Sequence, residues 1–129
     1  MKKLVLVCLL TLLSLPVFAC DREVTITRVV DGDTFAGVLH LGFGVDLNKR
    51  IRVLGFDAPE TWRPRNKQEA EHGRLATEYA TKLIENADII TFSGERFDSF
   101  GRVLLNICID GEDFVQKMVE AGFEKRSHY

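Results

Sequence analysis

The spacing of apolar residues changes from a strand-like period of two to a helical period and back again, and this order restricts the possible folds. Side chains in a strand point to opposite faces in turn, whereas apolar residues three and four positions apart share one helix face. The segments with strand character are residues 24–30, 34–41, 50–54, 89–92 and 102–109. The segments with helical spacing are residues 69–86 and 112–121, and Gly122 ends the second of them.

Three strands, a helix, two strands and a helix are typical of a small barrel of the oligonucleotide-binding (OB) type. We therefore predict a mostly β fold with helices, in the α+β class. The predicted fold is a five-stranded OB-fold barrel with one helix between strands three and four and another after strand five. A chain of 129 residues has room for one domain with a modest core.

Residues 1–19 have the composition of a secretory signal peptide. Lys2 and Lys3 precede an apolar run from Leu4 to Leu15, and small residues suited to cleavage come before Cys20. The run is shorter than the roughly 20 apolar residues of a spanning helix, so no stable membrane span is expected. We expect an exported protein, periplasmic or secreted, whose domain covers residues 20–129. Lipid attachment at Cys20 is the alternative.

Cys8 would leave with the signal peptide, so the exported chain would keep Cys20 and Cys108. In an oxidising compartment these two residues can form a disulfide. Cys108 fits equally well as a buried thiol within an apolar strand, and the two interpretations stay open here. No spacing of Cys and His resembles a zinc site.

Removing Lys2 and Lys3 leaves 15 basic residues against 19 acidic ones, a net charge of about −4. That balance argues against binding nucleic acid over a broad basic surface. Positive charge instead gathers within twenty residues of Glu60, either to hold substrate at one cleft or as ordinary solvated loop charge. The residues are Lys49, Arg50, Arg52, Arg63, Arg65 and Lys67.

Three short segments combine carboxylates with arginines: residues 31–34, 52–60 and 98–102. Carboxylates suit a hard cation, a further carboxylate can move a proton, and guanidinium groups bind phosphate. Charge that builds on phosphoryl oxygens in a transition state can be met by metal and arginine together. The combination predicts metal-dependent phosphodiester hydrolysis.

The order and spacing of these segments resemble the staphylococcal nuclease (thermonuclease) family over residues 24–123. The sequence Asp57-Ala58-Pro59-Glu60-Thr61 follows Arg52, and Asp98-Ser99-Phe100-Gly101-Arg102 comes about forty residues later. The resemblance implies an exported bacterial nuclease with a five-stranded OB barrel. It also implies that DNA and RNA phosphodiesters are cleaved with calcium as cofactor.

The resemblance also implies a role for each matching residue. Asp33 and Asp57 would bind calcium through their side chains and Ala58 through its backbone carbonyl, with waters and a substrate phosphate oxygen completing the six to eight ligands that calcium prefers. Glu60 corresponds to the catalytic glutamate, thought to act as general base on water. Arg52 and Arg102 correspond to the catalytic arginines, and fragments ending in 3′-phosphates are the implied products.

Four further residues are predicted to contact substrate: Trp62, Arg63, Phe100 and Tyr129. Aromatic rings can stack on bases with little sequence preference. Loop packing is the alternative for Trp62, and solvated loop charge is the alternative for Arg63. Phe100 stands where the best-known family member has a tyrosine, so a hydroxyl that could touch phosphate is missing.

Asp31 is interpreted as a turn former with a supporting role near the metal. His40, His72 and His128 are given no acid or base role, because neither metal-ligand spacing nor a nucleophile accompanies them. Larger family members carry another helix beyond the position of Gly122, so we expect less buried area and a more open cleft here.

Two functions from other classes stay open: a catalytically silent nucleic-acid-binding barrel, and an exported calcium-binding interaction module. The presence of Arg52, Glu60 and Arg102 favours the nuclease over the silent barrel. The expected partner is DNA and/or RNA, and the protein is expected to be a monomer.

Overall fold

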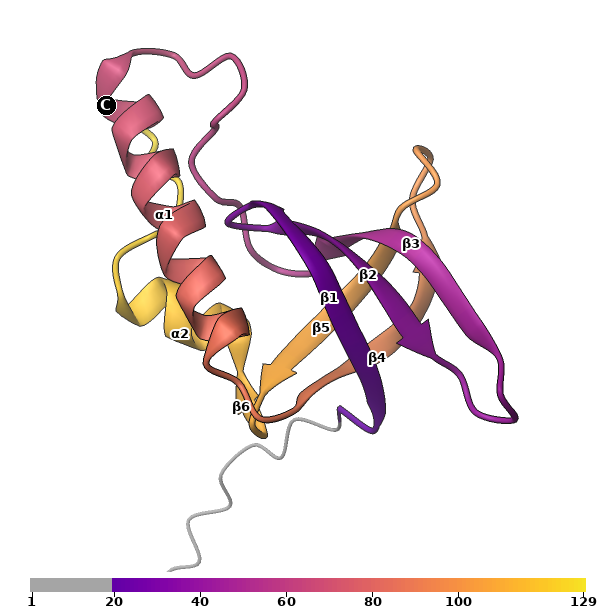
Figure 1. Ribbon diagram of the computed structural model, residues 1–129. Helices are drawn as coiled ribbons and strands as arrows, with labels where there is room; N and C mark the ends of the chain where they lie inside the picture. Colours follow the sequence, from indigo (N-terminus) through magenta and orange to yellow (C-terminus); the bar gives the residue numbers. More distant parts are fainter. Residues whose placement is uncertain (1–19) are drawn as a thin grey trace, which may run out of the picture.

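The computed structural model describes residues 20–129, and the predicted signal peptide at residues 1–19 lies outside them. In chain order the elements are β1 (Arg22–Asp31), β2 (Thr34–His40), β3 (Asp46–Val53), α1 (Lys67–Glu85), β4 (Ile90–Phe97), β5 (Val103–Ile109), β6 (Glu112–Asp113) and α2 (Phe114–Glu120) (Figure 1). Within residues 20–129, no helix combines the length and apolar character needed to cross a bilayer.

The five long strands close into a barrel. Strands β1, β2 and β3 form an antiparallel meander, β1 also pairs with β4, and β4 pairs with β5. Parallel pairing of β3 with β5 closes the sheet, and the two-residue β6 extends β5. The predicted α+β class, the OB-type barrel and the places of both helices are confirmed.

Strand β3 is longer than predicted, because residues 46–49 belong to it rather than to the hairpin connection. The tight turn is confined to residues 41–45, where the Val45 N–H donates to the Gly42 carbonyl over 2.9 Å. Lys49 occupies an inward position of the strand and lies 5.9 Å from the centre of the Phe97 ring. A lysine stem can cover apolar surface while its charge stays in water, which hides the strand pattern in the sequence.

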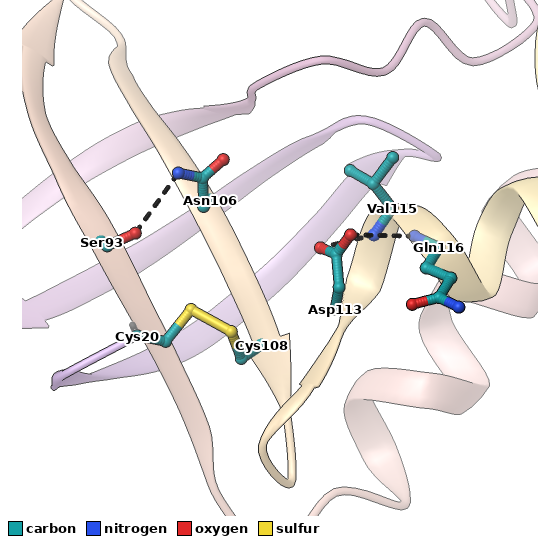
Figure 2. Close-up of a disulfide and its surroundings, with 7 residues drawn as sticks. All are labelled: Cys20, Ser93, Asn106, Cys108, Asp113, Val115 and Gln116. Atoms are coloured by element: carbon teal, nitrogen blue, oxygen red, sulfur yellow. Dashed lines mark hydrogen bonds between the residues drawn. A yellow bond between two sulfur atoms is a disulfide. The ribbon is translucent and has the colours of Figure 1, made fainter. Parts of the chain in front are cut away.

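The remaining boundaries differ by a few residues. Strand β4 continues to Phe97 through an irregularity in its pairing with β5 between Ser93 and Arg96. Helix α2 begins at Phe114, two residues later than predicted, because residues 112–113 pair with β5. The Asp113 carboxylate then caps the helix by accepting the N–H groups of Val115 and Gln116 (Figure 2).

The core fills the barrel and the space between the barrel and the helices. Its largest fully buried side chains include Phe35, Phe92, Ile51 and Phe114. The Phe35 and Phe114 rings meet edge to face at 5.4 Å, which joins α2 to the barrel. Helix α1 lies across one side of the barrel (Figure 1) and buries small residues such as Ala76 there, so it can approach closely.

Cys20 and Cys108 form a disulfide, with Cα atoms 6.2 Å apart (Figure 2). Of the two interpretations left open by the sequence, pairing is confirmed and the free buried thiol is wrong. The bond ties the start of the described chain to β5. A sulfur held in this bond cannot also carry a lipid.

Candidate active site

The turn between β1 and β2 carries the first of the three motif segments and holds Asp33 in a fixed position. The Asp33 carboxylate accepts the Ala58 N–H over 2.8 Å at one oxygen and the Thr34 hydroxyl over 2.8 Å at the other. Gly32 lets this turn sit close to its neighbours, because a Cβ there would lie 2.9 Å from the Ala58 Cβ. The side chain of Asp33 is therefore positioned by the loop that carries the second segment.

Asp31 forms the turn as predicted, since its carboxylate accepts the Asp33 N–H over 3.1 Å. Burial, the hydrogen bond with Asp33 and the Asp33 charge together raise the pKa of Asp31 to about 6. A third carboxyl group thus lies directly beside Asp33.

Arg52, at the end of β3, joins the first and second segments. Its guanidinium donates to the Phe56 carbonyl over 2.7 Å and to the Val53 carbonyl over 3.1 Å, which fixes the loop that follows the strand. The same guanidinium lies 3.3 Å from an Asp33 oxygen and forms an ion pair with Asp57. One arginine therefore brings together both carboxylates that the sequence predicts as metal ligands.

The donors fit the predicted ion in chemical type. Asp33 and Asp57 offer carboxylate oxygens and Ala58 a carbonyl oxygen, and oxygen is what calcium prefers. Within residues 20–129, no group of three or more His, Cys, Asp and Glu side chains is arranged to hold a metal. A complete calcium shell would therefore need water and a substrate oxygen as well.

Glu60 lies on the loop between β3 and α1, and helix α1 packs directly against that part of the loop. A Cβ at Gly73 would stand 2.9 Å from the Pro59 carbonyl oxygen and 3.0 Å from that of Glu60, so only a glycine allows this approach. The Glu60 carboxylate is half exposed and lies 3.4 Å from the Lys125 ammonium.

The sequence gives no indication of a role for Lys125. Its backbone N–H also donates to the Asp57 carbonyl over 2.9 Å. Two contacts thus join the segment after α2 to the predicted catalytic loop. Lys125 lies 65 residues from Glu60 in the chain, and no local spacing signals a contact at that separation.

Arg102 lies in the turn between β4 and β5, and Asp98 organises that turn. One Asp98 oxygen accepts the N–H groups of Phe100 and Arg102, each over 2.9 Å, and the other accepts the Arg102 Nε over 2.6 Å. Burial acts to raise the pKa of Asp98, but these hydrogen bonds outweigh it and hold the pKa below its ordinary value.

Arg102 lies beside the strand that carries Arg52. Ile51 on β3 pairs with Val103 on β5, and Arg102 immediately precedes Val103. Phe100, exposed to 83%, and Arg102 line a shallow hollow together with Arg50. From the sequence alone, Arg50 is one of the local basic residues and has no predicted contact with substrate.

Trp62 and Arg63 lie together on the exposed loop before α1. The Trp62 ring is 72% exposed, and the Arg63 guanidinium lies 4.3 Å from its centre. The pair leaves an aromatic face on the surface, and its contact with substrate stays a prediction.

Tyr129 is held by contacts within the protein. Its hydroxyl lies 2.9 Å from His72 Nδ1, and the Arg65 guanidinium lies 4.9 Å from the ring centre. His72 Nε2 donates to the Gly122 carbonyl over 2.8 Å, so Nδ1 of the neutral ring accepts from the tyrosine. These contacts give Tyr129 and His72 a packing role, and substrate binding by Tyr129 stays a prediction.

Comparison with known proteins identifies the family. The family model described as staphylococcal nuclease homologue matches residues 50–128, which include the second and third motif segments. The thermonuclease of Staphylococcus intermedius is 30% identical over 105 residues, covering 81% of this chain and 59% of that protein. The thermonuclease of Staphylococcus hyicus is 25% identical over 115 residues, covering 86% and 63%.

Endonuclease YhcR of Bacillus subtilis (strain 168) is 32% identical over 110 residues, covering 80% of this chain but 9% of that protein. The chain spans about three fifths of the length of the two thermonucleases. The family match covers more than half of the chain and includes Arg52, Glu60 and Arg102. The chain belongs to the staphylococcal nuclease family.

Proposed function

We propose that this protein is a calcium-dependent nuclease that hydrolyses phosphodiester bonds of DNA and/or RNA. The observation that carries the proposal is the position of Arg52 between Asp33 and Asp57, with Glu60 three residues after Asp57 on the same loop. Such a site has oxygen ligands for a cation, a carboxylate for a proton and a guanidinium for a phosphate within one small region. The family match supports the same activity.

Asp33, Asp57 and the Ala58 carbonyl would hold the calcium ion. When bound, the ion supplies positive charge against the phosphoryl oxygens and helps to orient the substrate. The hydrogen bonds from Ala58 and Thr34 fix the Asp33 carboxylate before any ligand arrives. Preorganised ligands of this kind lower the cost of ordering the site when it binds.

Glu60 would take a proton from the attacking water. Pro59, the residue before Glu60, has a fixed backbone dihedral φ. The close contact of Gly73 with the Pro59 and Glu60 carbonyl oxygens holds the same stretch of the loop against α1. The carboxylate is half exposed, so water can reach it. This access to water suits a general base.

Arg52 and Arg102 would bind the phosphate and stabilise the charge that develops in the transition state. A guanidinium can donate two parallel hydrogen bonds to two phosphate oxygens, which lysine cannot do. Donors of this kind commonly contribute about 10²–10³-fold to a rate. We propose products with 3′-phosphate ends.

We also propose that the protein is exported. Disulfides persist in oxidising compartments, and the Cys20–Cys108 bond suits one. The signal-like composition of residues 1–19 supports the same location.

The test uses the full chain, purified with its disulfide formed, and incubates it with single-stranded DNA and RNA. We expect cleavage with calcium and none with a chelator, and a fall of about 100-fold or more for Glu60→Gln. Glu71→Gln, on the exposed face of α1, should cleave like the parent. Cleavage that resists both the chelator and Glu60→Gln would contradict the proposal.

Calcium binding has a readout apart from cleavage, because a ligand that binds only the folded state raises the unfolding midpoint. The parent should gain thermal stability with calcium, and Asp57→Asn should lose most of that gain. A calcium-dependent gain in a protein that cleaves nothing would favour the calcium-binding module.

A further inference from the structure

We propose that a row of arginines on the outside of the barrel binds the nucleic-acid strand where it leaves the catalytic centre. The row consists of Arg28 on β1, Arg50 on β3 and Arg102 before β5. This inference deepens the proposed function and rests on it, because it takes the reacting phosphate to lie between Arg52 and Arg102.

Strand register places Arg28 and Arg50 in one line. Ala36 on β2 pairs with Arg28 on one side and with Arg50 on the other. Directly opposed residues of antiparallel strands point to the same face, with Cα atoms about 5 Å apart. Phe35, next to Ala36, is fully buried, so Ala36 and its two partners face outward. The two arginines therefore flank a small side chain, about 10 Å apart across two strands.

The line continues to the catalytic centre. Arg50 comes two residues before Arg52 and shares its face of β3, about 7 Å away along the strand. On the other side of β3, Arg50 lines the hollow that Phe100 and Arg102 complete. A strand held by Arg102 and Arg52 thus meets Arg50 next and Arg28 after it.

The charges of Arg28 and Arg50 are available for a partner. Arg52, Arg65, Arg74 and Arg102 each form an ion pair with a carboxylate. Neither Arg28 nor Arg50 has an ion pair or a side-chain hydrogen bond within the described part of the chain.

On the side away from the catalytic centre, the next row of the same face offers no counter-charge. It consists of Thr25, Val38 and Asn48, which are uncharged. Asp46, one row further along this face, already pairs with His40. In a protein with a net negative charge, two outward arginines without an ion pair, beside an uncharged row, make a local positive strip. A polyanion that continues from the catalytic centre complements it.

A single strand of nucleic acid is the occupant that the surface favours. Phosphates can contact the arginines one after another, while the exposed Phe100 ring offers a stacking surface for a base in the hollow. Arginines that track a backbone give affinity without reading sequence. The row should therefore bind long strands more tightly than short ones. It should not discriminate between base sequences.

The test compares Arg28→Ala and Arg50→Ala with Lys82→Ala, which removes one positive charge from exposed α1. The substrates are single-stranded DNA of 16 and of 4 nucleotides, with calcium at several salt concentrations. On the 16-mer we expect each arginine variant to raise KM about 5-fold while kcat stays within about twofold. The slope of log KM against log salt should fall by about 0.7 for each phosphate that the variant no longer binds. The Arg28→Ala defect should disappear on the 4-mer, and Lys82→Ala should match the parent throughout.

Equal KM values and salt slopes for the parent and all three variants would contradict the proposal that the row binds the strand. The proposed nuclease activity would be unaffected by that result. Binding of the labelled 16-mer in chelator, followed by fluorescence anisotropy, separates the two proposals. The nuclease proposal fails if the parent does not cleave. The proposal for the row is still supported in that case if Arg28→Ala and Arg50→Ala bind the 16-mer more weakly than Lys82→Ala does. Thermal unfolding of each variant shows whether the fold is intact.

Discussion

The charged residues proposed for metal binding and catalysis are each held by an opposite charge in the structure. Arg52 pairs with Asp33 and Asp57, and Arg102 pairs with Asp98. These contacts keep long side chains in place, which lowers the conformational entropy lost when a ligand binds. Because these side chains already have ion-pair partners, a ligand must displace those partners in order to bind.

At Arg102, substitution by lysine separates charge from geometry. Arg102→Lys keeps a positive charge but loses the forked donors that would bind two phosphate oxygens in the proposed mechanism. We expect kcat to fall about 10²–10³-fold with little change in the unfolding midpoint. Steady-state kinetics with Arg74→Lys on α1 as a control measures this. A loss of less than about threefold would show that charge alone suffices.

The carboxyl group of Glu69 should make the stability of the folded protein depend on pH. Burial acts to raise its pKa, but hydrogen bonds from the Arg65 side chain and backbone lower the pKa below its ordinary value. A lowered folded-state pKa contributes stability above the unfolded pKa of about 4.3, and that contribution is lost as pH falls toward the folded value. Glu69→Gln should therefore be less stable than the parent at pH 7.

The difference between Glu69→Gln and the parent should shrink steadily below about pH 4. Denaturant midpoints measured from pH 7 to pH 3 check this expectation. Glu71→Gln, at an exposed carboxylate of the same helix, serves as the comparison. A stability gap that stays constant over the whole pH range would contradict the assignment.

Among the elements, helix α1 has the most direct effect on the site, because Gly73 lets it touch the loop that carries Glu60. Gly73→Ala raises helix propensity by about 1 kcal/mol, yet the new Cβ would stand 2.9 Å from the Pro59 carbonyl oxygen. The loop must shift, and a shift of about 1 Å can cost about 100-fold in rate.

We therefore expect Gly73→Ala to lose about 10–100-fold in kcat. Calcium-dependent cleavage rates together with far-UV circular dichroism check this expectation. Lys82→Ala, another change to alanine on the same helix, should leave the rate unchanged. Full activity in Gly73→Ala would show that the contact does not position Glu60.

The sequence allowed the barrel, the helix positions and the motif loops to be predicted, because each rests on local spacing. Strand β3 was predicted short, because Lys49 occupies an inward position that usually holds an apolar residue. Strand β4 was predicted short, because Gly94 and Arg96 interrupt the apolar pattern at its irregular stretch.

Contacts between distant segments could not be predicted. Neither the 6.2 Å approach of Cys20 to Cys108 nor the contact of Lys125 with Glu60 leaves a local pattern. The packing of Tyr129 on His72 is a further case, since it depends on how the segment after α2 runs along α1. Arg28 and Arg50 became neighbours of Ala36 only once strand register was known.

For the whole molecule, the Cys20–Cys108 disulfide closes a loop across 88 positions of the chain. Cross-linking so large a loop restricts the unfolded chain, and losing such a bond costs about 2–4 kcal/mol. We expect the Cys20→Ser/Cys108→Ala double variant to unfold about 10–20 °C below the parent. Scanning calorimetry measures the shift. A parent whose midpoint is unaffected by reductant would contradict this.

If calcium and a substrate phosphate bind as proposed, Arg52 makes the binding of one depend on the binding of the other. A phosphate that takes this guanidinium leaves Asp33 and Asp57 without their counter-charge, and a cation that takes the two carboxylates frees the guanidinium. Whichever ligand arrives first prepares the site for the second. By thermodynamic reciprocity, substrate should tighten calcium binding by the same factor by which calcium tightens substrate binding.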